Sequence, residues 1–112
     1  ELGLFIDVGH AYLGALMRGR DHLDDIAALT GRARSLHLWN TTGPEFTRRN
    51  HHAALHPSQR TEDGWLDIER IIEVVARENP GINVIFEYPV EKVTPEIQEG
   101  YDWVARLLER FQ

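Results

Sequence analysis

Three short runs of branched and aromatic residues predict the strands of this protein. They are LGLFIDV at residues 2–8, RSLHLW at 34–39 and NVIFEYP at 83–89. Glycine, asparagine or proline bounds each run, which is typical of short strands buried in a sheet.

Helical periodicity fills the segments between and after these strands. Apolar residues recur at helical spacing over residues 21–30, 67–79 and 95–111, and we expect a short helical turn over 11–17. Gly31 supplies a stop for the first helix, and Thr94 followed by Pro95 marks the start of the last. The alternation predicts an α/β fold of three consecutive βα units, with parallel strands, right-handed crossovers and helices packed outside.

Residues 40–65 form a long polar segment without a strong period. Segments of this length without secondary structure are uncommon in compact domains unless they are functional or disordered. This one follows a strand and precedes a helix. It therefore lies at the carboxyl end of the predicted sheet, where α/β folds bind their ligands.

The phase of the three strands places one ionisable side chain near the carboxyl end of each, because side chains alternate between the two faces of a strand. The apolar faces, expected to meet the helices, carry Leu4, Ile6 and Val8, then Leu36 and Leu38, then Val84, Phe86 and Tyr88. The opposite faces carry Gly3, Phe5 and Asp7, then Ser35, His37 and Trp39, then Asn83, Ile85 and Glu87. Asp7, His37 and Glu87 therefore share a face and an end of the sheet.

Two carboxylates and an imidazole that converge in this way suit a divalent metal ion: Mn, Mg or Zn. Taken singly, the residues have simpler roles, since a strand-end aspartate is commonly a cap and a strand histidine is commonly hydrogen-bonded in the core. His10, three residues after Asp7, can reach the same site. His51, His52 and His56 all fall in the 40–65 segment.

Composition limits the class of protein only broadly. With 112 residues, 42% of them hydrophobic, the chain has material for one small core and one domain. A formal charge of −6 argues against general affinity for nucleic acid or an anionic membrane, although a local cationic cleft is compatible with it. The lack of cysteine leaves nitrogen and oxygen as metal ligands and suits a reducing cytoplasm. No apolar run is long enough to cross a bilayer, and the start at Glu1 indicates a piece of a longer protein.

Several segments together resemble a known family. They are DVGH at 7–10, LHLWN at 36–40, NHH…HPSQRTEDGWLDIERI within 50–71 and IFEYP at 85–89. These resemble the last three βα units of the xylose-isomerase-like TIM barrels, a superfamily of sugar phosphate isomerases and epimerases and of metal-dependent apurinic endonucleases (AP endonuclease family 2). The resemblance covers essentially the whole chain. It implies that residues 1–112 are the C-terminal fragment of a partial (β/α)8 barrel.

The resemblance also implies roles for single residues. Asp7, His37 and Glu87, already selected by strand phase, would bind the metal. His10 would contact the substrate or a second metal. The loop histidine of the endonuclease branch would fall at His51 or His52, and the family's remaining metal-binding glutamate lies on an earlier strand that this chain does not contain.

The leading functional hypothesis is a fragment of a metal-dependent isomerase or epimerase that acts on a sugar-like hydroxy-carbonyl compound. The metal would polarise the carbonyl and ease removal of the neighbouring proton. Glu87 would move that proton, with His10 at a substrate oxygen. Trp39 would pack on the apolar face of the sugar unless it belongs to the core. The fragment alone is expected to be inactive.

Two alternatives remain open. One is phosphodiester hydrolysis at abasic DNA, with Arg48, Arg49 and Arg60 as phosphate contacts. Asn40 and Asn50 stand near positions where the endonuclease branch has aspartate, which argues against a full three-zinc site. The other alternative is a non-catalytic barrel remnant that binds a ligand or a partner.

A partial barrel has two open sheet edges and an exposed inner face, here carrying Phe5, Trp39 and Ile85. We expect the chain to pair with the missing N-terminal part of the barrel or with copies of itself. In the alternative arrangement, the 40–65 segment covers the inner face of a self-sufficient unit.

Overall fold

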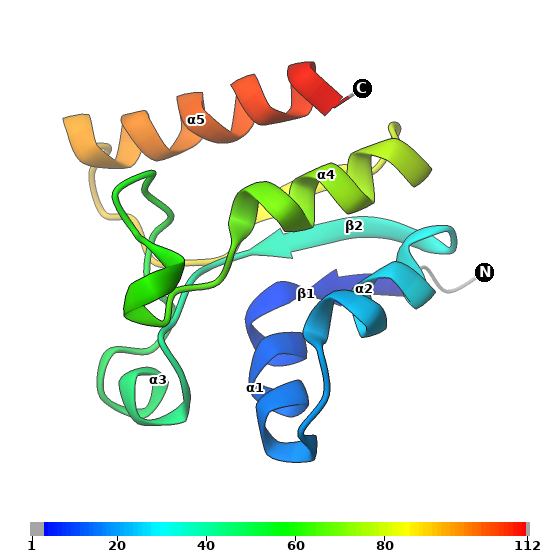
Figure 1. Ribbon diagram of the computed structural model, residues 1–112. Coiled ribbons are helices and arrows are strands. Elements are labelled where there is room, and N and C mark those ends of the chain that lie inside the picture. The colour runs from blue at the N-terminus through cyan, green and yellow to red at the C-terminus, as the bar shows by residue number, and fades with distance from the viewer. Residues whose placement is uncertain (1–3, 112) are drawn as a thin grey trace.

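In the computed structural model, which describes residues 4–111, three parallel strands form a sheet in the order β1-β2-β3. The strands are β1 (Leu4–Asp7), β2 (Ala33–Leu38) and β3 (Asn83–Phe86). The helices are α1 (Val8–Arg18), α2 (His22–Thr30), α3 (Pro44–Asn50), α4 (Ile68–Glu78) and α5 (Pro95–Phe111), with a 3-10 turn, η1, at Thr61–Asp63 (Figure 1). The predicted α/β class and the parallel strands are confirmed.

The first strand is shorter than predicted because Asp7 ends it. The Asp7 carboxylate accepts a hydrogen bond from the His10 backbone N–H at 2.9 Å and caps α1, so that Val8 is the first residue of a helix. The helical turn expected over residues 11–17 therefore begins three residues earlier. Leu2 and Gly3 of the predicted strand lie outside the described residues.

The helices pack on one face of the sheet. Ile6, Leu36 and Leu38 from the strands are buried there with Ile26 of α2 and Ile71 of α4. Figure 1 shows α2 and α4 beside the strands and α5 alongside α4, which places the core between these layers. The predicted apolar phase is confirmed for β2 and β3, whereas Leu4 is partly exposed at the start of β1, where the register with β2 shifts.

The opposite face of the sheet is open to solvent at Phe5 and Ile85, which are 54% and 44% exposed. Trp39, predicted to share this open face, is fully buried instead. Its indole N–H donates to Asp7 on the predicted face, but its predicted exposure was wrong because the 40–65 segment folds over the carboxyl end of β2, where the His52 ring stacks on the indole. The segment thus covers one end of the inner face and leaves the rest open.

Residues 40–65 are more ordered than their polarity predicted, since they contain α3 and η1. The buried amide of Asn40 holds the segment together. Its Oδ1 accepts from the backbone N–H groups of Thr41 at 2.9 Å and Leu66 at 3.0 Å, and its Nδ2 donates to Gln59 Oε1 at 2.8 Å. The Asn40 backbone also forms an antiparallel bridge with Ala53. One side chain therefore fastens both ends of the segment.

Candidate functional site

The register of the sheet brings the three predicted strand-end residues together. Asp7 pairs with His37 across β1 and β2, and His37 pairs with Ile85 across β2 and β3. Glu87 follows β3, and its backbone N–H donates to the Leu38 carbonyl at 2.9 Å, which extends the ladder past the strand. The position predicted from strand phase for Asp7, His37 and Glu87 is therefore the one observed.

His37 is held between two oxygen atoms. Its Nδ1 lies 2.7 Å from Glu87 Oε2, and its Nε2 lies 3.2 Å from Ser35 Oγ. Because an ionised carboxylate only accepts hydrogen bonds, Nδ1 carries the proton and the Nε2 lone pair of the neutral ring faces the Ser35 hydroxyl. The Phe5 ring stacks on the imidazole at 4.4 Å between centroids. Glu87 thus orients His37, as outer carboxylates commonly do for metal-binding histidines.

The Asp7 carboxylate contacts three groups, which belong to the two residues Trp39 and His10. Its Oδ1 accepts from the Trp39 indole N–H at 2.6 Å and from the His10 backbone N–H, and its Oδ2 lies 3.0 Å from His10 Nδ1. The Asp7 carboxylate is largely buried, whereas the His10 side chain is 65% exposed. Asp7 therefore caps α1, and the same carboxylate also orients the solvent-exposed imidazole of His10.

Trp39 is a support for this site and presents no surface to a sugar, because its side chain has no exposed area. Its predicted contact with the substrate is therefore wrong for this arrangement. A Cβ on Gly9 would lie 2.1 Å from two indole atoms, so that only glycine fits between α1 and the ring. The glycine of the DVGH motif is explained by this contact, which no pattern in the sequence indicated.

His52 belongs to the site and His51 does not. The His52 ring stacks on Trp39 at 3.7 Å with an interplanar angle of 9°, and its Nδ1 donates to the Glu87 carbonyl at 2.7 Å. Its centroid lies 5.8 Å from that of His10. His51 is exposed at the C-terminal end of α3, with a positive φ of 59°. Of the two histidines between which the sequence left the choice open, His52 is therefore the one that lies beside the strand-end residues.

The predicted metal ligands have suitable donor atoms but are paired with other side chains. Within residues 4–111, no three histidine, aspartate or glutamate side chains are arranged to hold a metal ion. Asp7 is engaged with Trp39 and His10, and Glu87 with His37. A metal bound to all three predicted ligands would have to open both carboxylate–histidine pairs.

Strand phase placed Ser35 on the face of His37, but no role in the site was assigned to it, although residues two apart in a strand are neighbours on one face. Tyr88, next to Glu87, packs near Tyr101, and burial together with that phenol raises the pKa of Tyr88 to about 12. Tyr88 packs with Phe86 and Tyr101 on the helix side of the sheet, and its phenol is neutral at ordinary pH.

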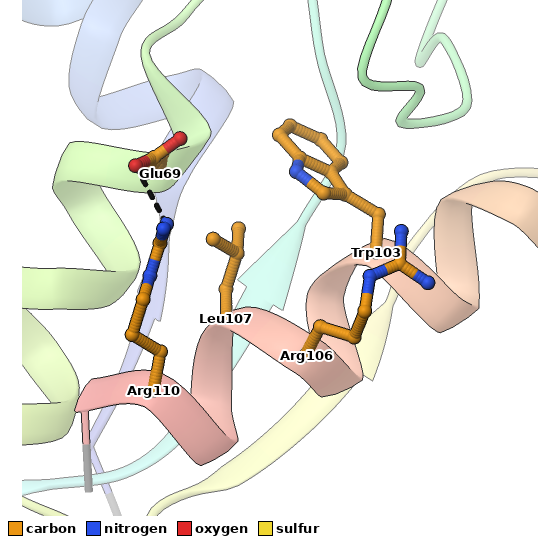
Figure 2. A pocket seen from close by; sticks show the side chains of 5 residues that line it. All are labelled: Glu69, Trp103, Arg106, Leu107 and Arg110. Carbon is orange, nitrogen blue, oxygen red and sulfur yellow. Dashed lines mark hydrogen bonds and ion pairs between the residues drawn. The ribbon is translucent and has the colours of Figure 1, made fainter.

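A surface hollow of about 300 Å³ lies elsewhere, between α4 and α5. It is lined by Glu69, Trp103, Arg106, Leu107 and Arg110 (Figure 2). Arg110 donates to Glu69 at 2.6 Å across it. No residue of the strand-end site lines this hollow.

Comparisons with known protein families, curated proteins and solved structures returned no match. Among residues 4–111, no helix combines the length and the apolar character needed to span a membrane.

Proposed function

We propose that this chain is the C-terminal part of a xylose-isomerase-like (β/α)8 barrel. In this proposal it supplies part of the active site of a cytoplasmic, metal-dependent isomerase or epimerase for a sugar-like hydroxy-carbonyl compound. One observation carries the proposal: two carboxylate–histidine pairs, Asp7–His10 and His37–Glu87, lie side by side at the carboxyl end of a parallel sheet. That end is the ligand-binding side of α/β folds.

A divalent ion, Mn, Mg or Zn, would be held by Asp7, His37 and Glu87, with His52 as the neighbouring loop histidine. When bound, the ion would polarise the substrate carbonyl. Nitrogen and oxygen donors of this kind suit these metals. Metal binding and the two carboxylate–histidine pairs compete for the same atoms, so the affinity should depend on how easily the pairs open.

The residues of the chain would carry out the proton transfer. Isomerisation requires one group to take a proton from carbon and another to stabilise the oxygen. The exposed His10 imidazole, oriented by Asp7, is placed to donate to a substrate oxygen. Glu87, partly exposed and bonded to His37, is the carboxylate that would accept the proton from carbon. Trp39 would keep Asp7 and His52 in position.

Deuterium exchange tests this function without knowledge of the substrate. Aldoses, ketoses and their phosphates are incubated in D₂O with Mn²⁺, Mg²⁺ or Zn²⁺ and the full protein that carries this chain. We expect NMR to show loss of the proton next to the carbonyl. His37→Ala should abolish the exchange, whereas His51→Ala, which changes an exposed neighbour of His52, should leave it intact. Exchange that survives His37→Ala would refute the assignment.

The nuclease alternative receives less support from the arginines of the 40–65 segment. Arg48 and Arg49 share Glu45, and Arg60 pairs with Glu62, so two of the three positive charges are offset by nearby carboxylates. Duplex DNA with an abasic site is nonetheless the appropriate second substrate in the same experiment. Cleavage of this duplex would favour the nuclease. Metal binding without exchange or cleavage would favour a remnant that binds a ligand or partner.

A further inference from the structure

A second group of polar side chains lies away from the strand-end site. His56 and Ser58 come from the 40–65 segment, and Glu99 comes from α5. His56 Nδ1 lies 2.7 Å from Ser58 Oγ, and His56 Nε2 lies 2.6 Å from Glu99 Oε2. We call these three residues the loop cluster. None of them contributes to the strand-end site.

Close backbone packing holds the loop cluster together. Gly100 of α5 faces the carbonyl of Leu55, and a Cβ at Gly100 would lie 2.2 Å from that oxygen. The absence of a side chain at Gly100 lets α5 approach the segment just before His56. Glu99, the preceding residue, is thereby brought within hydrogen-bond distance of the imidazole.

The hydrogen bonds define which nitrogen of His56 carries the proton. The backbone N–H of Ser58 donates to His56 Nδ1 at 3.2 Å, and an N–H group can only donate. Nδ1 is therefore the unprotonated nitrogen, and Nε2–H donates to the Glu99 carboxylate. The Nδ1 lone pair also faces the Ser58 hydroxyl at 2.7 Å. His56 is in the tautomer that can take a proton from Ser58.

We propose that Ser58 is an activated nucleophile, with His56 as its general base and Glu99 as the group that orients His56. A hydroxyl within hydrogen-bond distance of a base that a carboxylate orients is the arrangement that activates serine. Here the hydroxyl faces Nδ1 and the acid faces Nε2. Ser58 is exposed, and Pro57 and Gln59 on either side of it line a hollow of about 170 Å³. The three cluster residues do not line that hollow, so an acyl group on Ser58 would extend into solvent.

The substrate class is an activated ester, such as an aryl ester of a short carboxylic acid. The Ser58 proton passes to His56 Nδ1 as Oγ forms a bond to the carbonyl carbon. The bond from that carbon to the aryl oxygen then breaks, and the aryl oxide leaves and takes up the proton. Water, deprotonated by His56, hydrolyses the acyl-serine to the carboxylic acid and free Ser58. An aryl oxide is a stable leaving group, so the reaction places little demand on further catalytic groups.

Acylation by p-nitrophenyl acetate and labelling by a fluorophosphonate test the proposal on the intact chain. We expect mass spectrometry to locate both adducts on Ser58 and Ser58→Ala to remove them. Thr61→Ala, which removes an exposed hydroxyl that contacts Glu62 and no histidine, should leave them unchanged. His56→Ala should slow acylation about 100-fold or more, in the range of lost general-base catalysis.

Glu99→Gln is a variant that should keep the fold, because glutamine can still accept a hydrogen bond from Nε2–H. A slower reaction in this variant would therefore not result from misfolding. We expect this variant to remain folded by circular dichroism and to acylate about tenfold more slowly, since the negative charge that favours imidazolium is gone. Adducts on Ser35, or acylation at the wild-type rate in Ser58→Ala, would overturn the proposal. An unmodified Ser58 under conditions that acylate free serine amide would also overturn it.

Discussion

Among residues 4–111, two groups of serine, histidine and glutamate side chains are connected by hydrogen bonds, one on the sheet and one on the loop. In the sheet cluster, Ser35, His37 and Glu87, the acid contacts Nδ1 and the serine lies at 3.2 Å from Nε2. In the loop cluster the acid contacts Nε2 and the serine lies at 2.7 Å from Nδ1. Sheet register positions the first, and the packing of a helix on a turn positions the second.

The two clusters differ most in what covers them. Phe5 stacks on His37, and Trp39 and His52 close the neighbouring end of the strands. Ser58 has no such cover and is exposed. The same three side-chain types therefore suit different tasks: an enclosed histidine held at a fixed angle suits binding of a metal or substrate, and an exposed hydroxyl suits attack on a substrate from solution.

Substitution of one glycine in each region should disrupt the packing of that region alone and cause the largest losses of stability. Gly9→Ala drives a methyl group into the Trp39 indole, and Gly100→Ala drives one into the Leu55 carbonyl. We expect each to lower the free energy of unfolding by about 3 kcal/mol, measured by urea denaturation, because both sites are overpacked. Gly31→Ala is the control, because a Cβ added there would have no heavy atom within 4 Å and the φ of −64° suits alanine. We expect it to change the free energy of unfolding by less than about 1 kcal/mol.

The local consequences of the two variants should also differ. Gly9→Ala should shift the NMR signal of the Trp39 indole N–H and leave Ser58 acylation largely unchanged. Gly100→Ala should slow acylation and leave that indole signal near its original position. If each variant changes both the indole signal and the acylation rate, the two regions are structurally coupled.

Metal binding separates the two adjacent loop histidines. If Mn²⁺ or Zn²⁺ binds at the strand ends, His52→Ala should weaken it about 10–100-fold, as loss of a supporting residue does at metal sites. His51→Ala should leave the affinity unchanged, because His51 is exposed at the end of α3. Isothermal titration calorimetry on the wild-type chain and both variants measures the difference. Equal losses in the two variants would contradict the placement of His52.

The open face of the sheet should drive association. Parallel sheets normally have both faces covered, and here Phe5 and Ile85 remain exposed beside the sheet cluster. We expect light scattering to show a mass that rises above 12.9 kDa with concentration and falls back in the Phe5→Ser, Ile85→Ser double variant. Met17→Ser is the control, since Met17 is 83% exposed but lies on α1. A monomer at all concentrations would remove the association hypothesis.

The smallest expected effect concerns His22, a histidine outside both clusters. Burial lowers the pKa of His22 below 6.5, while Asp21, Asp67 and Asp25 partly oppose the shift. The unfolded chain therefore binds this proton more readily than the folded one. Stability should fall as the pH drops below about 6.5, until the folded-state pKa is passed. His22→Gln should flatten this part of the stability curve in urea titrations at several pH values, whereas an unchanged slope would assign it to other groups.

Strand phase predicted the sheet cluster well because the period of two is rigid. Asp7, His37 and Glu87 lie at one end of the sheet as expected. The same reasoning placed Trp39 on the face of Asp7 correctly but could not predict its burial, which depends on where the 40–65 segment folds.

The loop cluster could not be predicted at all. His56 and Glu99 are 43 residues apart, and their contact depends on the close approach of α5 at Gly100. Neither residue belongs to a pattern that specifies this approach. Local periodicity determines which face a side chain occupies, but only the tertiary packing determines which distant partner it meets.

Asn40 anchors the segment that contributes to both regions. The segment that carries both His52 and His56 is tied down through this one amide, whose Oδ1 accepts from the buried backbone groups of Thr41 and Leu66. Its Nδ2 holds Gln59, and Gln59 in turn accepts from the His56 N–H at 3.0 Å. In the language of hydrogen exchange, these residues form one cooperative unit, and the Thr41 and Leu66 amides should exchange with the same opening free energy. Each opening of that unit would lift His52 from the Trp39 ring, whereas the contact between His56 and Ser58, two residues apart on the same segment, would stay closed.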